Sequence, residues 1–257
     1  MPDSVDRLLA RIDYQGSREP CRQTLDSLQK KFMRQVPFEN LDIHLGRRIV
    51  LDERRVWHKI VDQHRGGWCF ELNEVFRWLL TELGFTVSRA ASGVLLDGGD
   101  AGEFNPFDHL TLLVHLDGRR YLSDVGFGDN VQCALDIDDR SPRSDGRAQY
   151  RINPAGARFQ LERLESGTWT PQHSVDVVSR AWSEFSQRCE FLQTSPASKF
   201  ARKRVCSLVG KHGLVSLTGN TLNVAGRRSD VAEAKYHDVL LDHFGVDIAG
   251  GQWIRPI

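Results

Sequence analysis

Apolar residues in the first third of the chain recur three and four positions apart. This spacing occurs in residues 5–12, 25–32 and 56–60, and most clearly in residues 72–83. It is the period of one face of an α-helix. Asp52 is placed to cap the third of these segments, and Gly84 ends the fourth. The pattern predicts four helices before residue 85.

The middle of the chain follows a different pattern. Residues 85–96, 109–116 and 119–124 are rich in apolar and small residues and are expected to be strands. Asp117-Gly118 separates the last two and is typical of a two-residue hairpin turn, and Ser166-Gly167 gives a second hairpin signal. Residues 97–100 and 136–146 are expected to be loops.

The last third is mixed. A short helix is expected over residues 182–192, and strands over residues 205–209 and 214–224, the second interrupted by residues 218–220. Ser229 is a possible cap for a closing helix that runs through Val231 to Phe244, with Gly245 after it. We find no internal repeat and no low-complexity segment.

Composition narrows the class of protein. The 257 residues are 40% hydrophobic, and Lys plus Arg and Asp plus Glu each number 34, so the formal net charge is zero. No basic field favours nucleic acid and no polybasic segment favours a membrane surface. No apolar run is long enough to span a bilayer, and the first residues lack a signal-peptide pattern. We therefore expect a cytoplasmic protein with neither nucleic-acid nor membrane partners.

The cysteines indicate chemistry rather than cross-linking. There are five, at positions 21, 69, 133, 189 and 206, an odd number without a CxxC motif. This argues against a disulfide framework and against a metal site. Only Cys69 has a special setting, because Gly66 and Gly67 precede it and the strongest predicted helix follows. A helix N-terminus favours a thiolate, the nucleophilic form. Cys69 on its own is nevertheless equally compatible with a buried packing cysteine.

A base and its orienting carboxylate can be placed by counting through the predicted hairpin. If Asp117-Gly118 is a two-residue loop, Thr111 lies opposite Asp124, and His109 shares the parity of Thr111. His109 and Asp124 then project from one face as diagonal neighbours roughly 7–8 Å apart at the backbone. Each also has an ordinary explanation, a strand histidine bonded to a carbonyl and a strand-end turn residue.

Other residues compete for these two roles. Asp108 is a rival carboxylate, but adjacent strand residues point to opposite faces. His64 is near Cys69 in sequence but precedes the glycine turn, and His44 and His115 are further candidates for the base.

Four segments, in order, resemble the arylamine N-acetyltransferase family. They are residues 36–41 (Val-Pro-Phe-Glu-Asn-Leu), residues 65–71 (Arg-Gly-Gly-Trp-Cys-Phe-Glu), the strand that begins at His109, and residues 124–128 (Asp-Val-Gly-Phe-Gly). Residues 11–16 also match, and the resemblance is weaker after residue 130. The combination is specific although each segment alone is moderate.

The resemblance implies an α+β fold with a cysteine-protease-like Cys-His-Asp core. The expected parts are a helical bundle over residues 1–84 with the nucleophile, a β-barrel over residues 85–192 with the histidine and aspartate, and an α/β lid over residues 193–257. It implies acetyl transfer from acetyl-CoA to arylamines, hydrazines or N-hydroxyarylamines through an acetyl-cysteine, in xenobiotic metabolism, without a metal.

The resemblance also assigns residues. The catalytic residues would be Cys69, His109 and Asp124. The acceptor site would include Phe38, Val94, Gly126 and Phe127, for which core packing is the plainer explanation. Asn105 and Pro106 would contact coenzyme A. Lys199, Arg202, Lys203 and Arg204 form a basic run that could meet its phosphates, although a solvated face explains the run more simply.

Three other functions remain open from the sequence. An amide synthase that cyclises or releases a polyketide thioester would use the same residues. A cysteine hydrolase shares the triad logic but passes the acyl group to water. A non-catalytic binding module would be expected to lack one of the three residues, and all three are present.

Overall fold

The predicted N-terminal helices are present. The computed structural model describes residues 2–94, 105–210, 213–248, 251 and 253, so the predicted loop at residues 97–100 lies outside the described residues. The helices are α1 (Pro2–Arg11), α2 (Arg22–Gln35), α3 (Leu41–His44), α4 (Glu53–Trp57) with its π-helical continuation η1 (His58–Asp62), and α5 (Cys69–Glu82). The Asp52 side chain caps α4 by accepting from the backbone N–H of Arg55 at 3.0 Å, as predicted. Among the helices described, none is long and apolar enough to cross a membrane.

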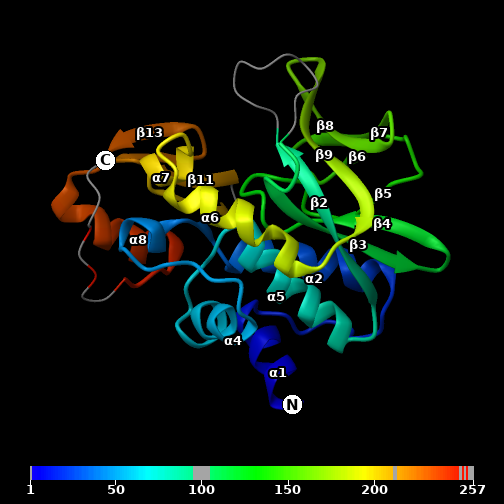
Figure 1. Cartoon of the computed structure of the whole chain (residues 1–257), viewed down its shortest axis with the longest axis horizontal. Helices are drawn as coiled ribbons and strands as arrows, with labels where there is room; N and C mark the ends of the chain where they lie inside the picture. Colours follow the sequence, from blue (N-terminus) through cyan, green and yellow to red (C-terminus); the bar gives the residue numbers. More distant parts are fainter. Residues whose placement is uncertain (1, 95–104, 211–212, 249–250, 252, 254–257) are drawn as a thin grey trace.

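An eight-stranded antiparallel sheet forms the middle of the chain (Figure 1). Its strands are β2 (Thr86–Val94), β3 (His109–Leu116), β4 (Arg119–Ser123), β5 (Leu135–Asp136), β6 (Arg143–Ser144), β7 (Gln149–Ala155), β8 (Arg158–Glu165) and β9 (Thr168–Ser179). They follow the order β5-β4-β3-β2-β9-β8-β7-β6. Because β5 also contacts β7, the sheet curls into a nearly closed barrel.

A smaller sheet, three α-helices and two 3-10 helices complete the described part of the fold. After the 3-10 helix η2 (Trp182–Phe185) come α6 (Ser186–Thr194), α7 (Lys199–Arg202), β10 (Val205–Gly210), β11 (Gly213–Thr218), β12 (Thr221–Val224), β13 (Arg227–Asp230), the 3-10 helix η3 (Glu233–Lys235) and α8 (Tyr236–Phe244). The predicted cap at Ser229 is wrong. Ser229 lies in β13 opposite Leu222, and the closing helix begins only at Tyr236. Gly245 does end it, in the left-handed conformation.

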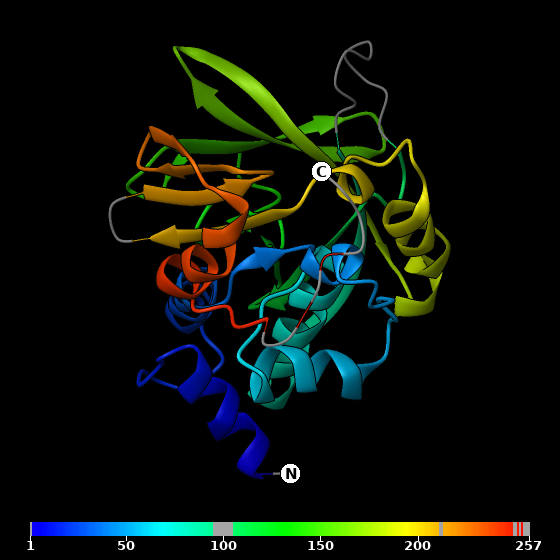
Figure 2. The same ribbon diagram turned by 90° about the vertical axis from the view of Figure 1, so that its left-hand side faces the viewer.

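The N-terminal third of the chain contributes one strand to the smaller sheet. Strand β1 (Phe38–Glu39) pairs with β10, with Phe38 opposite Ser207. This sheet lies beside the barrel and above the N-terminal helices, as Figure 2 shows. The largest hydrophobic cluster joins α1, α2 and α5 to the face of β3 that carries Leu110, Leu112 and Val114. Helix α5 is consequently buried along most of its length, which gives its N-terminus a rigid base.

A buried cluster of charges underlies the turn before α5. Arg65 is 2% exposed and binds Glu39 Oε1 at 2.7 Å through its guanidinium. The Lys59 ammonium lies 3.0 Å from Glu71 Oε2 and 2.9 Å from Asp42 Oδ2. These ion pairs link β1, α3, η1 and α5, since a charge at this depth needs a partner of opposite sign.

We expect Glu39→Gln to lower the free energy of unfolding by about 3 kcal/mol, because it removes the main partner of a buried guanidinium. Urea denaturation measures this change. The control is Asp138→Asn, which breaks the exposed Arg120–Asp138 pair and should cost no more than about 1 kcal/mol. Equal costs for the two variants would contradict a structural role for the cluster.

Candidate active site

Cys69 is the first residue of α5, as its sequence setting suggested. The preceding turn is held against β1, because Glu39 N–H donates to the Gly67 carbonyl at 2.8 Å and Gly67 N–H donates to the Pro37 carbonyl at 3.2 Å. A Cβ at Gly66 would lie 2.1 Å from the Pro37 carbonyl oxygen, so only glycine allows this approach. The Cys69 side chain is 5% exposed, with Sγ 4.0 Å from the Asp108 carbonyl oxygen.

His109 and Asp124 meet as the hairpin count predicted. Asp117 and Gly118 both have positive φ, and Leu116 pairs with Arg119 across them. The resulting register brings His109 Nε2 to 2.7 Å from Asp124 Oδ2. Because Asp124 occupies Nε2, Nδ1 is the ring nitrogen available to Cys69, whose side chain interacts with His109.

Four further hydrogen-bond donors and one close backbone contact fix the positions of the His109–Asp124 pair and of Cys69. Asn73 donates its amide to Asp124 Oδ1 at 2.9 Å, and Gly126 N–H donates to the same oxygen at 2.8 Å. Asn130 donates to Oδ2 at 3.0 Å. Asn73 also receives Val125 N–H, which fixes the loop after β4 against α5. A Cβ at Gly126 would lie 2.7 Å from Cys69 Cα, so glycine is needed there too.

Burial and neighbouring charges shift the pKa values of His109 and Asp124 in opposite directions. Burial alone would lower the pKa of His109, but the Asp124 carboxylate and the Cys69 side chain outweigh it and raise that pKa. Burial alone would raise the pKa of Asp124, and His109 outweighs it so that this pKa falls below its usual range. The site therefore favours a charged imidazolium on His109, hydrogen-bonded to the Asp124 carboxylate.

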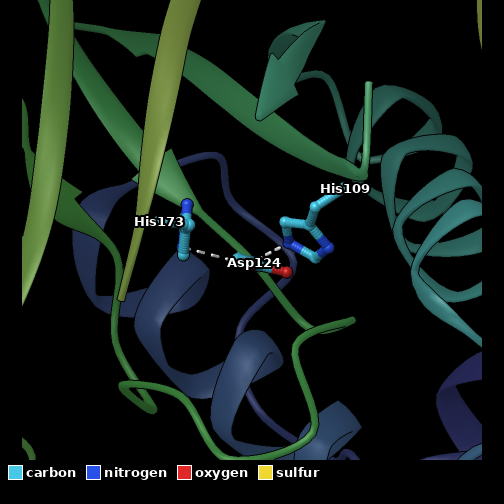
Figure 3. Close-up of side chains that lie close together, drawn as sticks. All are labelled: His109, Asp124 and His173. Atoms are coloured by element: carbon cyan, nitrogen blue, oxygen red, sulfur yellow. Dashed lines mark hydrogen bonds and ion pairs between the residues drawn. The ribbon is translucent and has the colours of Figure 1, made fainter. Parts of the chain in front are cut away.

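A second histidine, His173 of β9, completes the cluster. Its Nε2 lies 3.7 Å from Asp124 Oδ2, and Figure 3 shows Asp124 between the two imidazole rings. Ligand atoms of His109, Asp124 and His173 all lie within 4.8 Å of one another, a spacing that a metal ion could use. His109 and Asn130 both form hydrogen bonds to the Asp124 carboxylate. These hydrogen bonds explain why the side chains lie so close together.

The sequence predictions missed four residues here: Asn73, Asn130, Arg188 and His173. Asn73 lies four positions after Cys69 on the same helix, a spacing that could have identified it. The other three come from distant segments. Arg188 of α6 forms an ion pair at 2.5 Å with Asp108, the other carboxylate considered for the orienting role. The rival His64 is exposed, and so is His115.

A cavity of about 770 Å³ opens beside Cys69 and His109. All four residues expected at the acceptor site line it, namely Phe38, Val94, Gly126 and Phe127. Asn105 lines it as well, and the neighbouring Pro106 is exposed.

The basic run within residues 199–204 divides between the cavity and the interior. Lys199, Arg202 and Lys203 line the cavity and are also exposed to solvent. Arg204 does not share this setting. It is 1% exposed, stacks on Tyr236 and pairs with Glu233.

This geometry is that of enzymes in which a cysteine, assisted by a histidine and a carboxylate, carries an acyl group. A family model described as N-acetyltransferase matches residues 23–253. The chain belongs to the arylamine N-acetyltransferase family.

Individual relatives agree over most of the chain. The arylamine N-acetyltransferase pineal gland isozyme NAT-3 of Gallus gallus is 33% identical, with 84% of this chain and 81% of the relative covered. The solved arylamine-N-acetyltransferase of M. tuberculosis is 28% identical with a TM-score of 0.89, covering 95% of this chain and 94% of that one. The Mycobacterium marinum enzyme in complex with CoA is 27% identical with a TM-score of 0.89, covering 96% and 94%. Members of this family use acetyl-CoA as the acetyl donor.

We expect Asp124→Asn to raise the pH at which Cys69 becomes reactive by roughly 1–3 units, because the carboxylate is what raises the pKa of His109. A less basic His109 forms less imidazolium, so the thiolate then needs a higher pH. The rate of Cys69 alkylation by iodoacetamide as a function of pH measures the shift. An unchanged or lowered midpoint would contradict this assignment of charge.

Proposed function

We propose that this chain transfers an acetyl group from acetyl-CoA to an aromatic amine by way of Cys69. The observation that carries the proposal is that Cys69 and His109 both line the cavity, while Asp124 is hydrogen-bonded to His109. In the first step, the Cys69 proton passes to His109 and the thiolate attacks the thioester carbonyl. The new C–S bond forms as the bond to coenzyme A breaks, and His109 returns the proton to the departing thiolate.

The second step releases the acetyl group to the acceptor. The amine nitrogen attacks the acetyl carbon, His109 takes the nitrogen's proton, and Cys69 leaves as the thiolate. Asp124 holds His109 in orientation and stabilises its charged form in both steps. Backbone N–H groups at the start of α5 would stabilise the negative oxygen of each tetrahedral intermediate.

The residues that line the cavity support separate binding regions for the acceptor and for the acetyl donor. Phe38, Val94 and Phe127 offer an aromatic ring an apolar site, with Gly126 admitting close approach, so arylamines, aryl hydrazines and N-hydroxyarylamines are the proposed acceptors. The phosphates of coenzyme A would lie at the basic end formed by Lys199, Arg202 and Lys203, and Asn105 and Pro106 would contact the cofactor from the loop before β3.

We further propose a division of labour along the chain: a helical bundle over residues 1–84, a barrel over 85–192 and a lid over 193–257. The nucleophile on α5, the base on β3 and the cavity lining from α7 support it. A cytoplasmic location is proposed because acetyl-CoA and a reduced cysteine are both available there.

Incubation with acetyl-CoA alone should add one acetyl group to Cys69, visible in the intact mass and by peptide mapping. Cys69→Ser should stay unmodified, whereas Cys21→Ser, which removes an exposed cysteine, should still be acetylated. An aromatic amine should discharge the acetyl-enzyme much faster than water does. Rapid discharge by water would favour a hydrolase, and no acetylation at all would exclude acetyl-CoA as the donor.

We expect Lys203→Ala to raise the KM for acetyl-CoA about tenfold with little change in kcat, because one phosphate contact of this kind contributes on the order of 1.5 kcal/mol. The control is a second acetyl donor, S-acetyl-N-acetylcysteamine, which is a thioester without phosphates. Its KM should not change in the variant. An equal rise for both donors would mean that Lys203 shapes the cavity and does not bind phosphate.

A further inference from the structure

The histidine behind Asp124 is held from its far side by a serine. His173 is fully buried, and Ser92 Oγ of β2 lies 2.7 Å from its Nδ1. The same Oγ lies 2.6 Å from the carbonyl oxygen of Ser174. The ring also packs against Phe127, with centroids 4.9 Å apart. His173 is thus fixed in position by contacts that do not involve Asp124.

The hydrogen bonds of Ser92 determine which nitrogen of His173 carries the proton. A serine hydroxyl has one proton to donate, and a carbonyl oxygen can only accept. At 2.6 Å from the Ser174 carbonyl, that proton must lie on the bond to this oxygen. Ser92 Oγ can then only accept from His173, so the proton of His173 is on Nδ1.

Nε2 of His173 is consequently the bare nitrogen. Among the described residues it has no hydrogen-bond partner, although it is fully buried and lies 3.7 Å from Asp124 Oδ2. The titratable groups that face the ring are His109 from β3 and Asp124 from the loop after β4. Burial and the charge of His109 lower the pKa of His173 to about 3, so the ring stays neutral at working pH.

We propose that Ser92 and His173 are positioning residues that keep a proton donor away from Asp124 on the side opposite His109. Oδ2 of Asp124 already accepts from His109 and Asn130. A third hydrogen-bond donor, at Nε2 of His173, would partly neutralise the charge of the Asp124 carboxylate. The carboxylate would then stabilise the His109 imidazolium less. The bare nitrogen therefore leaves the charge of Asp124 directed at His109. This inference rests on the proposed roles of His109 and Asp124.

The tautomer can be measured on the unmutated protein. Histidine ring nitrogens labelled with ¹⁵N and observed near pH 7 should give a protonated, pyrrole-type shift for Nδ1 of His173 and a bare, pyridine-type shift for Nε2. Through-bond correlations assign the two signals. Protonation at Nε2 would overturn the proposal, and this result depends on no variant folding.

Variants test the consequence for the site. Ser92→Ala removes the acceptor at Nδ1 and lets the ring donate from Nε2 to Asp124, so the midpoint pH of Cys69 alkylation by iodoacetamide should rise by about one unit. Ser92→Thr keeps a hydroxyl and should restore the original midpoint. Ser174→Ala is the matched control, because its hydroxyl has no partner among the described residues and its carbonyl remains.

A profile for Ser92→Ala that coincides with that of Ser174→Ala would overturn the proposal. The measurements use neither acetyl-CoA nor an amine, so they separate this inference from the proposed function. If the tautomer and the shift are as expected while acetyl-CoA leaves Cys69 unmodified, the proposed reaction fails and the positioning role stands.

Discussion

A buried carboxylate must be surrounded by donors to remain charged, and the site around Asp124 follows from this requirement. The side chain is 2% exposed, and it receives hydrogen bonds from α5, from β3 and from its own loop. Asn73 is central, because the one amide group donates to Asp124 and to the Leu110 carbonyl while its oxygen accepts from Val125. The helix that begins with Cys69 is therefore bonded directly to the strand with His109 and to the loop with Asp124. The relative positions of all three residues depend on satisfying one charge.

The charge cluster beneath the turn before α5 is a second group of buried charges that must be compensated. Glu39, Asp42 and Glu71 share Lys59 and Arg65, so three acids are balanced by two bases in the interior. Burial raises the pKa of Glu71 to about 7, against the pull of Lys59, and its carboxylate also accepts from Trp68 N–H at the start of α5. A cluster with this imbalance can hold a proton near neutral pH. The cluster bonds to the start of α5 through Glu71, and the Asp124 group bonds to the same helix through Asn73, so both fix the N-terminal turns of α5.

The parts of this arrangement that sequence could predict are the local ones. The helices with long apolar stripes were correctly predicted, and so was the hairpin at Asp117-Gly118, whose two-residue loop determines that His109 and Asp124 share a face. Strand β13 was mistaken for the start of a helix. Its four residues are all exposed and polar, and only pairing with β12 makes them a strand. His173 could not be predicted from the sequence either, because its position depends on the pairing of β2 with β9 across a register shift. No count along the chain can locate a residue that a distant strand brings in.

The position of Cys69 also constrains the order of the proposed reaction. The sulfur is almost fully buried, and among the residues that line the cavity it is the one thiol. Phe38 and Phe127 line the same cavity as Cys69, so the thioester end of coenzyme A and an aromatic acceptor would both have to lie next to the sulfur in order to react with it. Two substrates that need the same space next to one sulfur atom cannot react with each other directly. The acetyl group must then wait on Cys69 while the donor leaves, and the separation of the two steps follows from the shape of the site rather than from the chemistry of the thioester.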